Sequence, residues 1–93
     1  MNSKGINKMK KLIEKCIEMD KLLREENIKI WEGMFEKFAE EIEKNKEIDE
    51  IKRKIRQSMS GGMGSFNDLV LSDNEADKKL RKLRQELFEL SIL

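Results

Sequence analysis

The sequence predicts an all-α protein, an irregular four-helix bundle with a structured glycine-rich loop before its last helix. Apolar residues recur at spacings of three and four along most of the 93 residues, as in amphipathic helices that share one core. Charged residues make up 42% of the chain and proline is absent, so the outer helix faces are solvated and no proline interrupts them. A chain of this length forms one domain, residues 1–93.

The first helix is expected over residues 5–25, after a frayed start. Its apolar stripe is formed by Ile6, Met9, Leu12, Ile13, Cys16, Ile17, Met19, Leu22 and Leu23. Cys16 lies on this stripe, and the sequence contains no histidine that could activate its thiol. As the single cysteine it cannot form a disulfide within the chain, so we interpret it as a small core residue.

The second helix is expected over residues 27–44, with Asn27 as its N-terminal cap. It has the strongest amphipathic pattern and carries Trp31, whose large ring should anchor the core with two phenylalanines of the same helix. Gly33 would lie inside this helix at a cost of about 1 kcal/mol relative to alanine. A close crossing with another helix would explain a glycine there.

The third helix is expected over residues 46–59, with acidic residues in its first turn and a basic stretch, 52–56, toward its end. This polarity suits the helix dipole, which is sufficient to explain the basic stretch. Contact with a phosphate or an acidic partner is the alternative.

The packed loop, residues 60–72, contains three glycines that let the backbone turn: Gly61, Gly62 and Gly64. Four apolar residues follow and should pack back over the helices: Phe66, Leu69, Val70 and Leu71. Asn67 and Asp68 can bond nearby backbone groups and hold the shape of the loop.

The fourth helix is expected over residues 74–92, with a leucine repeat of the 3.5-residue type. Ser72 and Glu75 have the spacing of a capping box, and Asn74 and Asp77 offer a second box in a shifted register. A second basic stretch, 78–84, lies near the helix start, where the dipole does not favour it. Its candidates for partner contact are Lys78, Arg81 and Lys82, and a solvated surface is the alternative.

Several kinds of chemistry are not expected. Without histidine and with one cysteine, we expect no catalytic residues, no metal site and no cofactor. The glycine segment lacks the lysine of a phosphate-binding loop, and Asn67 occupies the third glycine position of a dinucleotide fingerprint. No signal-peptide block and no apolar run of about 20 residues occurs, so we expect a cytoplasmic protein.

The glycine segment resembles the mark of a family of small bacterial immunity proteins: Gly-Gly-Met-Gly-Ser, then Phe or Leu, then Asn-Asp-Leu. The matching residues are Gly61, Gly62, Met63, Gly64, Ser65, Phe66, Asn67, Asp68 and Leu69. The resemblance implies a protein that binds and neutralises a cognate toxin domain, with a nuclease (RNase) delivered by contact-dependent growth inhibition as the expected toxin. It implies no catalytic residues. Either the motif and Trp31 have a structural role or the motif contacts the partner.

A nuclease inhibitor commonly complements a basic cleft with acidic groups, whereas the formal charge of this chain is only +1. If the second helix stays straight, one acidic face collects Glu36, Glu40, Glu43 and Glu47, after Glu32. This face is a candidate for partner binding. An ordinary solvated face, and toxin binding away from the active site, are the alternatives.

Two other classes of function remain open. A small nucleic-acid-associated helical protein would use the basic stretches 52–56 and 78–84. A self-associating structural protein is the third possibility, although we expect a monomer when the chain is free.

Overall fold

The computed structural model describes residues 3–44, 47–59, 66 and 69–92. It confirms the all-α prediction, since this part of the chain forms four α-helices and contains no strand. The helices are α1 (Ser3–Glu25), α2 (Met34–Glu43), α3 (Ile48–Met59) and α4 (Asn74–Ile92), with a short 3₁₀ helix, η1 (Lys29–Trp31), between α1 and α2. α4 has the predicted bounds, and α1 begins two residues earlier than predicted.

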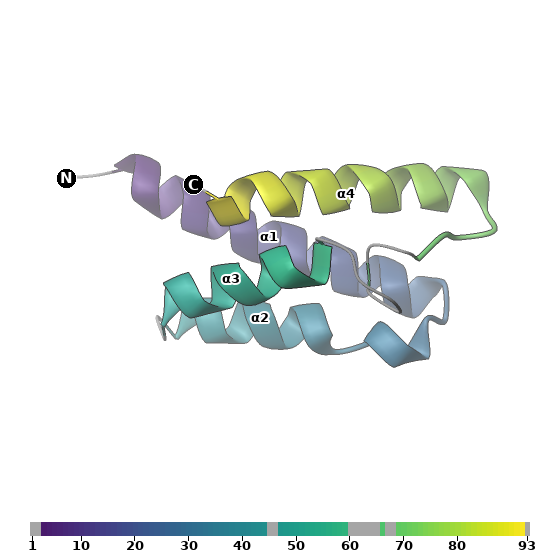
Figure 1. Ribbon diagram of the computed structural model, residues 1–93, viewed down its shortest axis with the longest axis horizontal. Coiled ribbons are helices and arrows are strands. Elements are labelled where there is room, and N and C mark those ends of the chain that lie inside the picture. Colours follow the sequence, from purple (N-terminus) through teal and green to yellow (C-terminus); the bar gives the residue numbers. More distant parts are fainter. Residues whose placement is uncertain (1–2, 45–46, 60–65, 67–68, 93) are drawn as a thin grey trace.

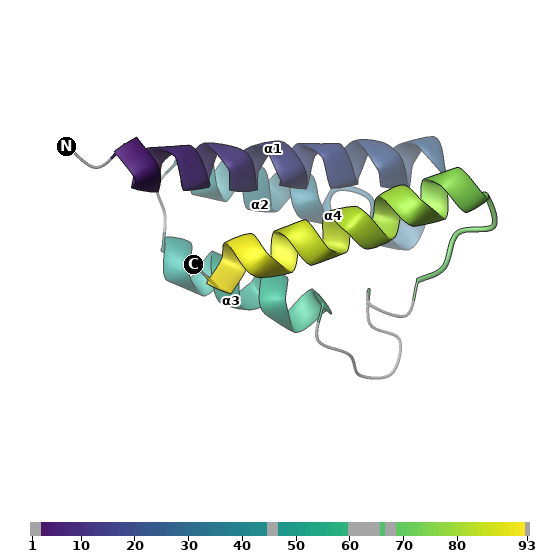
Figure 2. The ribbon, with the colours of Figure 1, turned by 90° about the horizontal axis from the view of Figure 1, so that it is seen from above.

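The four helices form a closed ring. α1 packs against α2 and α4, and α3 packs against the same two helices from the other side. Figure 1 shows α4 along the top of the molecule and α2 along the bottom. The view from above in Figure 2 shows that α4 crosses over the bundle at an angle to α1, so the bundle is irregular. The molecule is elongated, with extents of 44 × 24 × 20 Å.

One core fills the ring, and every helix contributes to it. Its buried apolar residues are Leu12, Cys16, Met19, Leu22, Leu23, Phe35, Phe38, Ala39, Ile42, Ile51, Ile55, Phe66, Leu71, Ala76, Leu80, Leu83 and Leu87. The prediction that Cys16 is a core residue is confirmed, because its side chain is fully buried. Ile17, predicted on the apolar stripe of the first helix, is instead exposed.

The predicted second helix, residues 27–44, is wrong in its first third. The chain forms η1, turns at Glu32 and Gly33, and begins α2 only at Met34. Trp31 therefore lies on η1 and not on α2. It is partly buried and packs against the core, as its predicted anchoring role requires.

Asn27 terminates α1 instead of beginning the next helix. Its φ of 58° is left-handed, and its N–H donates to the Arg24 carbonyl at 3.2 Å. The Ile28 N–H reaches back to the Leu23 carbonyl at 2.9 Å. These two bonds form a Schellman motif, which Asn can close because it tolerates left-handed backbone. The partly buried Ile28 side chain packs against the core, the apolar contact that accompanies this motif.

Gly33 forms the fixed turn before α2, called the hinge below, and does not lie inside a helix. It is the N-cap of α2, with a φ of 86° that L side chains rarely adopt. A Cβ added there would meet nothing within 4 Å, so a close crossing with another helix does not explain this glycine. Left-handed backbone, and not lack of space, explains the glycine.

The connection into α4 is described at Phe66 and from Leu69 onward. Phe66 and Leu71 are buried and Leu69 packs against the core, whereas Val70 is 68% exposed, contrary to the predicted packing of all four apolar residues. Arg84 of α4 donates to the carbonyls of Phe66 at 3.1 Å and Leu69 at 3.0 Å. This side chain holds the connection against the bundle.

Neither predicted capping box begins α4. The cap is Asp73, whose Oδ2 accepts the Ala76 N–H at 2.9 Å. Asp77 instead reaches back to the Leu71 N–H at 2.9 Å, through Oδ1. A carboxylate on Asp73 satisfies an N–H of the first turn more strongly than a hydroxyl would, because it carries charge.

Candidate partner-binding surface

The acidic face is shorter than predicted. Glu36, Glu40 and Glu43 are all exposed on α2, at spacings of four and three that place them on one side of this helix. Glu47 does not belong to this face, because α2 ends at Glu43 and Glu47 precedes α3. Its carbonyl accepts the N–H groups of two residues in the first turn of α3. Glu32 lies before the hinge and is likewise outside α2.

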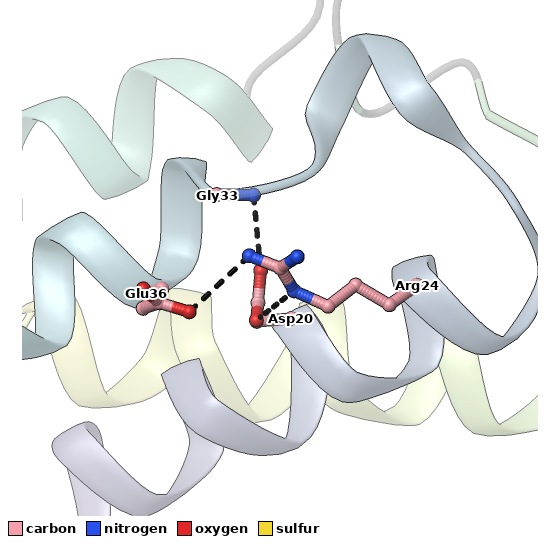
Figure 3. Close-up of polar contacts among 4 residues, drawn as sticks. All are labelled: Asp20, Arg24, Gly33 and Glu36. Atoms are coloured by element: carbon pink, nitrogen blue, oxygen red, sulfur yellow. Dashed lines mark hydrogen bonds and ion pairs between the residues drawn. The ribbon is translucent and has the colours of Figure 1, made fainter.

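A network of polar side chains fixes the start of the acidic face (Figure 3). Asp20 of α1, only 7% exposed, accepts the Gly33 N–H through Oδ1 at 3.0 Å. Its Oδ2 accepts from Arg24 Nε at 2.7 Å, and Arg24 Nη2 lies 3.2 Å from Glu36 Oε2. The hydrogen bond to Asp20 raises the pKa of Arg24 further above its already high value. The hinge, α1 and the first glutamate of the face are therefore held together.

Asp20 and Arg24 are not among the residues predicted from the sequence. A signal for Asp20 does exist, because it follows the buried Cys16 by four residues on the core-facing side of α1. Its partner is a backbone N–H thirteen residues away, and no periodicity reveals such a pairing.

The basic face of α4 is exposed, but one of its residues, Arg81, already forms an ion pair. Lys78, Arg81 and Lys82 all face solvent. Arg81 Nε pairs with Asp77 Oδ2 at 3.0 Å. Lys78 and Lys82 make no ion pair with any residue that the structure describes. These two lysines are the best-placed cations of the predicted set.

In the other basic stretch, 52–56, both arginines form bonds within the protein. Arg53 pairs with Glu50 one turn earlier on α3. Arg56 donates to the carbonyl of Ser91, which joins α3 to the last turn of α4. This use of its arginines leaves the stretch less suited to binding nucleic acid.

The structure does not bring the predicted acidic and basic residues together. The acidic face belongs to α2 and the basic face to α4, which lie on opposite sides of the molecule in Figure 1. The near-zero formal charge of the chain therefore conceals two separate surfaces of opposite sign.

Phe66 is the described member of the glycine motif that carries a buried side chain. Its ring is fully buried, with its centroid 5.6 Å from that of Trp31 in an edge-on arrangement and 5.1 Å from that of Phe35. The Arg84 guanidinium lies 5.9 Å from the same centroid. The structure thus gives Phe66 a packing role. Of the remaining predicted motif residues, Gly61, Gly62, Gly64, Asn67 and Asp68 lie outside the described residues.

A shallow groove runs between α1 and α4. Its lining residues are Lys11, Glu14, Lys15, Glu86, Glu89 and Leu90. Lys15 Nζ crosses it, 3.1 Å from Glu18 and 3.3 Å from Glu86. These carboxylates, Glu18 first, raise the pKa of Lys15 and keep it charged. The ion pair between Lys15 and Glu86 joins α1 to α4 across this groove.

Burial raises the pKa of the Cys16 thiol to about 12, so the thiol is protonated and unreactive at neutral pH. Across the described ranges, no three acidic or cysteine side chains gather in a way that could hold a metal ion. None of the helices in the described part of the chain is long and apolar enough to cross a membrane.

Residues 24–86, more than half of the chain, match a family described as a domain of unknown function, DUF6966. The chain belongs to this family. The DUF6966 match begins at Arg24 and therefore includes η1, the hinge, α2 and α3, and α4 as far as Glu86. It contains both the acidic face and the basic face. No curated protein and no solved structure matches the chain.

Proposed function

We propose that this protein is an immunity protein, which binds a cognate bacterial toxin domain in a one-to-one complex and neutralises it. The expected toxin is a nuclease of the contact-dependent growth inhibition type. The class rests on the resemblance of residues 61–69 to the mark of such proteins. The protein would act by occupying a surface, without chemistry of its own.

The observation that carries the proposal is the exposed acidic face of α2. Glu40 and Glu43 make no ion pair with a described residue and are free to meet a basic partner. Glu36 is held by Arg24, and the helix start is held through Asp20 and Gly33. A nuclease that binds phosphates has a basic cleft, and an ordered acidic face complements it with little loss of conformational entropy.

Co-expression with a candidate toxin domain, sought in the neighbouring reading frames, tests the proposal. The wild type should restore growth and should copurify with the toxin domain. The double variant Glu40→Lys/Glu43→Lys should bind the toxin domain at least about tenfold more weakly, because two attractive charges become repulsive. Binding by the wild type should also weaken as salt is raised.

The matched control is Glu14→Lys/Glu89→Lys, which changes the net charge equally at two residues of the groove between α1 and α4. It should retain binding. Equal loss in both double variants would mean that only net charge matters. No rescue and no complex with the wild type would refute the proposal itself.

A further inference from the structure

The start of α2 is held by a side chain of another helix. Its N-cap residue is Gly33, so α2 has no side-chain cap of its own. Asp20 of α1 supplies a carboxylate there instead, and its Oδ1 accepts the Gly33 N–H at 3.0 Å. Figure 3 shows this carboxylate between the Gly33 backbone and the guanidinium of Arg24. A negative charge at this position also suits the positive end of the α2 dipole.

Apolar packing alone fixes the direction of α2 weakly. Four buried residues attach α2 to the core: Phe35, Phe38, Ala39 and Ile42. Burial of apolar surface is non-directional, and α2 is only ten residues long. A hydrogen bond to its first N–H depends on both distance and angle, so it constrains the rotation of the helix as well as its position.

The rotation of α2 decides where its exposed glutamates point. Glu40 and Glu43 make no ion pair with a described residue, so their direction is that of the helix itself. Glu36 is tied to Arg24, but both of these side chains are about half exposed, and exposed ion pairs contribute little. The largely buried Asp20 is therefore the residue that holds the acidic face in place.

The molecule contains a second carboxylate with the same set of bonds. Asp77 of α4 is also largely buried, and its Oδ1 accepts the Leu71 N–H at 2.9 Å. Its Oδ2 lies 3.0 Å from Nε of Arg81, four residues later on the same helix, as Oδ2 of Asp20 lies 2.7 Å from Nε of Arg24. Asp77 holds the segment before α4, whereas Asp20 holds the helix that carries the acidic face.

We propose that Asp20 is a positioning residue of the partner interface. Its carboxylate sets the direction in which α2 presents Glu40 and Glu43 to the basic groups of the partner. The inference rests on the proposed function and adds to it a residue that does not touch the partner. Asp77, with the same bonds but no link to the acidic face, is the matched control within the same chain.

The first experiment needs no partner. Spin labels on Lys8→Cys of α1 and Lys37→Cys of α2, both exposed positions, report the distance between the two helices by electron paramagnetic resonance. The native thiol of Cys16 is fully buried, so the labels attach to the introduced cysteines. The labelled chain should give a narrow distance distribution. Asp20→Asn should broaden it, because one amide oxygen cannot accept from both the Gly33 N–H and Arg24.

Two further variants complete this measurement. Asp20→Ala, which removes both acceptors, should broaden the distribution more than Asp20→Asn does. Asp77→Asn should leave it as narrow as in the labelled parent. All distributions are measured at a temperature at which thermal unfolding shows each variant to be fully folded. A purely structural role of Asp20 would lower the unfolding temperature and leave the distance distribution of the folded protein unchanged.

The second experiment measures affinity for the toxin domain that copurifies with the wild type. Asp20→Asn should weaken binding at least about threefold, whereas Asp77→Asn should bind within about twofold of the wild type. The two variants lose the same negative charge, so a general effect of net charge would weaken both equally. In a Glu40→Gln/Glu43→Gln background, Asp20→Asn should cause little additional loss, because Asp20 acts through these two glutamates.

Two results would overturn the role of Asp20 and leave the proposed function intact. One is an unchanged distance distribution in both Asp20 variants. The other is equal weakening of binding by Asp20→Asn and Asp77→Asn. By contrast, a wild type that binds no toxin domain would refute the proposed function, and with it the interface that Asp20 is proposed to position.

Discussion

At the scale of the residue, Gly33 shows how one backbone angle decides the course of the chain. Inside a helix, Gly33→Ala would stabilise the protein by about 1 kcal/mol. At a φ of 86°, the same change should instead destabilise it by about 1–2 kcal/mol, because a Cβ strains left-handed backbone. Denaturant unfolding of the two proteins measures this difference and its sign.

Gly33→Asn is the companion variant, since asparagine tolerates left-handed backbone better than alanine. It should lose less stability than Gly33→Ala. A stabilised Gly33→Ala protein would contradict the hinge and would favour a continuous second helix.

Individual residues also show which parts of the candidate site sequence can predict. The exposure of Glu36, Glu40 and Glu43 follows from helical spacing, because these residues lie opposite the buried phenylalanines of α2. The position of Glu47 does not follow from helical spacing, because it depends on where α2 ends. Exposed Ile30 was also missed, because an apolar residue is expected inside unless its backbone turns it outward.

At the scale of the element, apolar periodicity predicts the helices well, whereas local capping motifs predict poorly where the helices begin and end. The α4 bounds of 74–92 agree with an apolar repeat that runs unbroken from Ala76 to Leu90. The second helix was predicted too long because Asn27 suits either an N-cap or a left-handed C-terminal position. The Schellman bonds and the packing of Ile28 on the core favour the second role, and that packing is a tertiary interaction.

The start of α4 provides a test at this scale. Asp73→Ala should cost about 1 kcal/mol of stability, because it leaves the Ala76 N–H without its side-chain acceptor. Ser72→Ala, at the adjacent residue, should change stability by less than about 0.5 kcal/mol. Thermal or denaturant unfolding distinguishes them, and the reverse order would restore the Ser72 capping box.

At the scale of the whole molecule, the closed ring of helices makes stability depend on a shared core. Cys16 lies inside this core, and burial raises its thiol pKa from 9.0 to about 12. The folded state therefore favours the neutral thiol. This contribution is fully present below about pH 9, the unfolded pKa, and is lost as pH rises through about 12.

The stability of the wild type should consequently fall between pH 9 and 12 relative to Cys16→Ala, by up to about 1.4 kcal/mol per pH unit. The comparison is necessary because the raised pKa of Lys15 also belongs to the alkaline range. Denaturant unfolding at several pH values measures both proteins. Parallel curves would mean that the thiol ionises without opening the core.

The contact of Trp31 with Phe66 has an optical consequence. The chain holds one tryptophan and no tyrosine, so its intrinsic fluorescence comes almost entirely from the indole of Trp31. The indole contacts the fully buried ring of Phe66. The residue before Trp31 in the sequence, Ile30, is exposed. Unfolding should shift its emission to longer wavelength, whereas a partner that covers the exposed part of the indole should shift it to shorter wavelength. The protein thus contains an unlabelled fluorescent reporter that separates loss of fold from gain of partner.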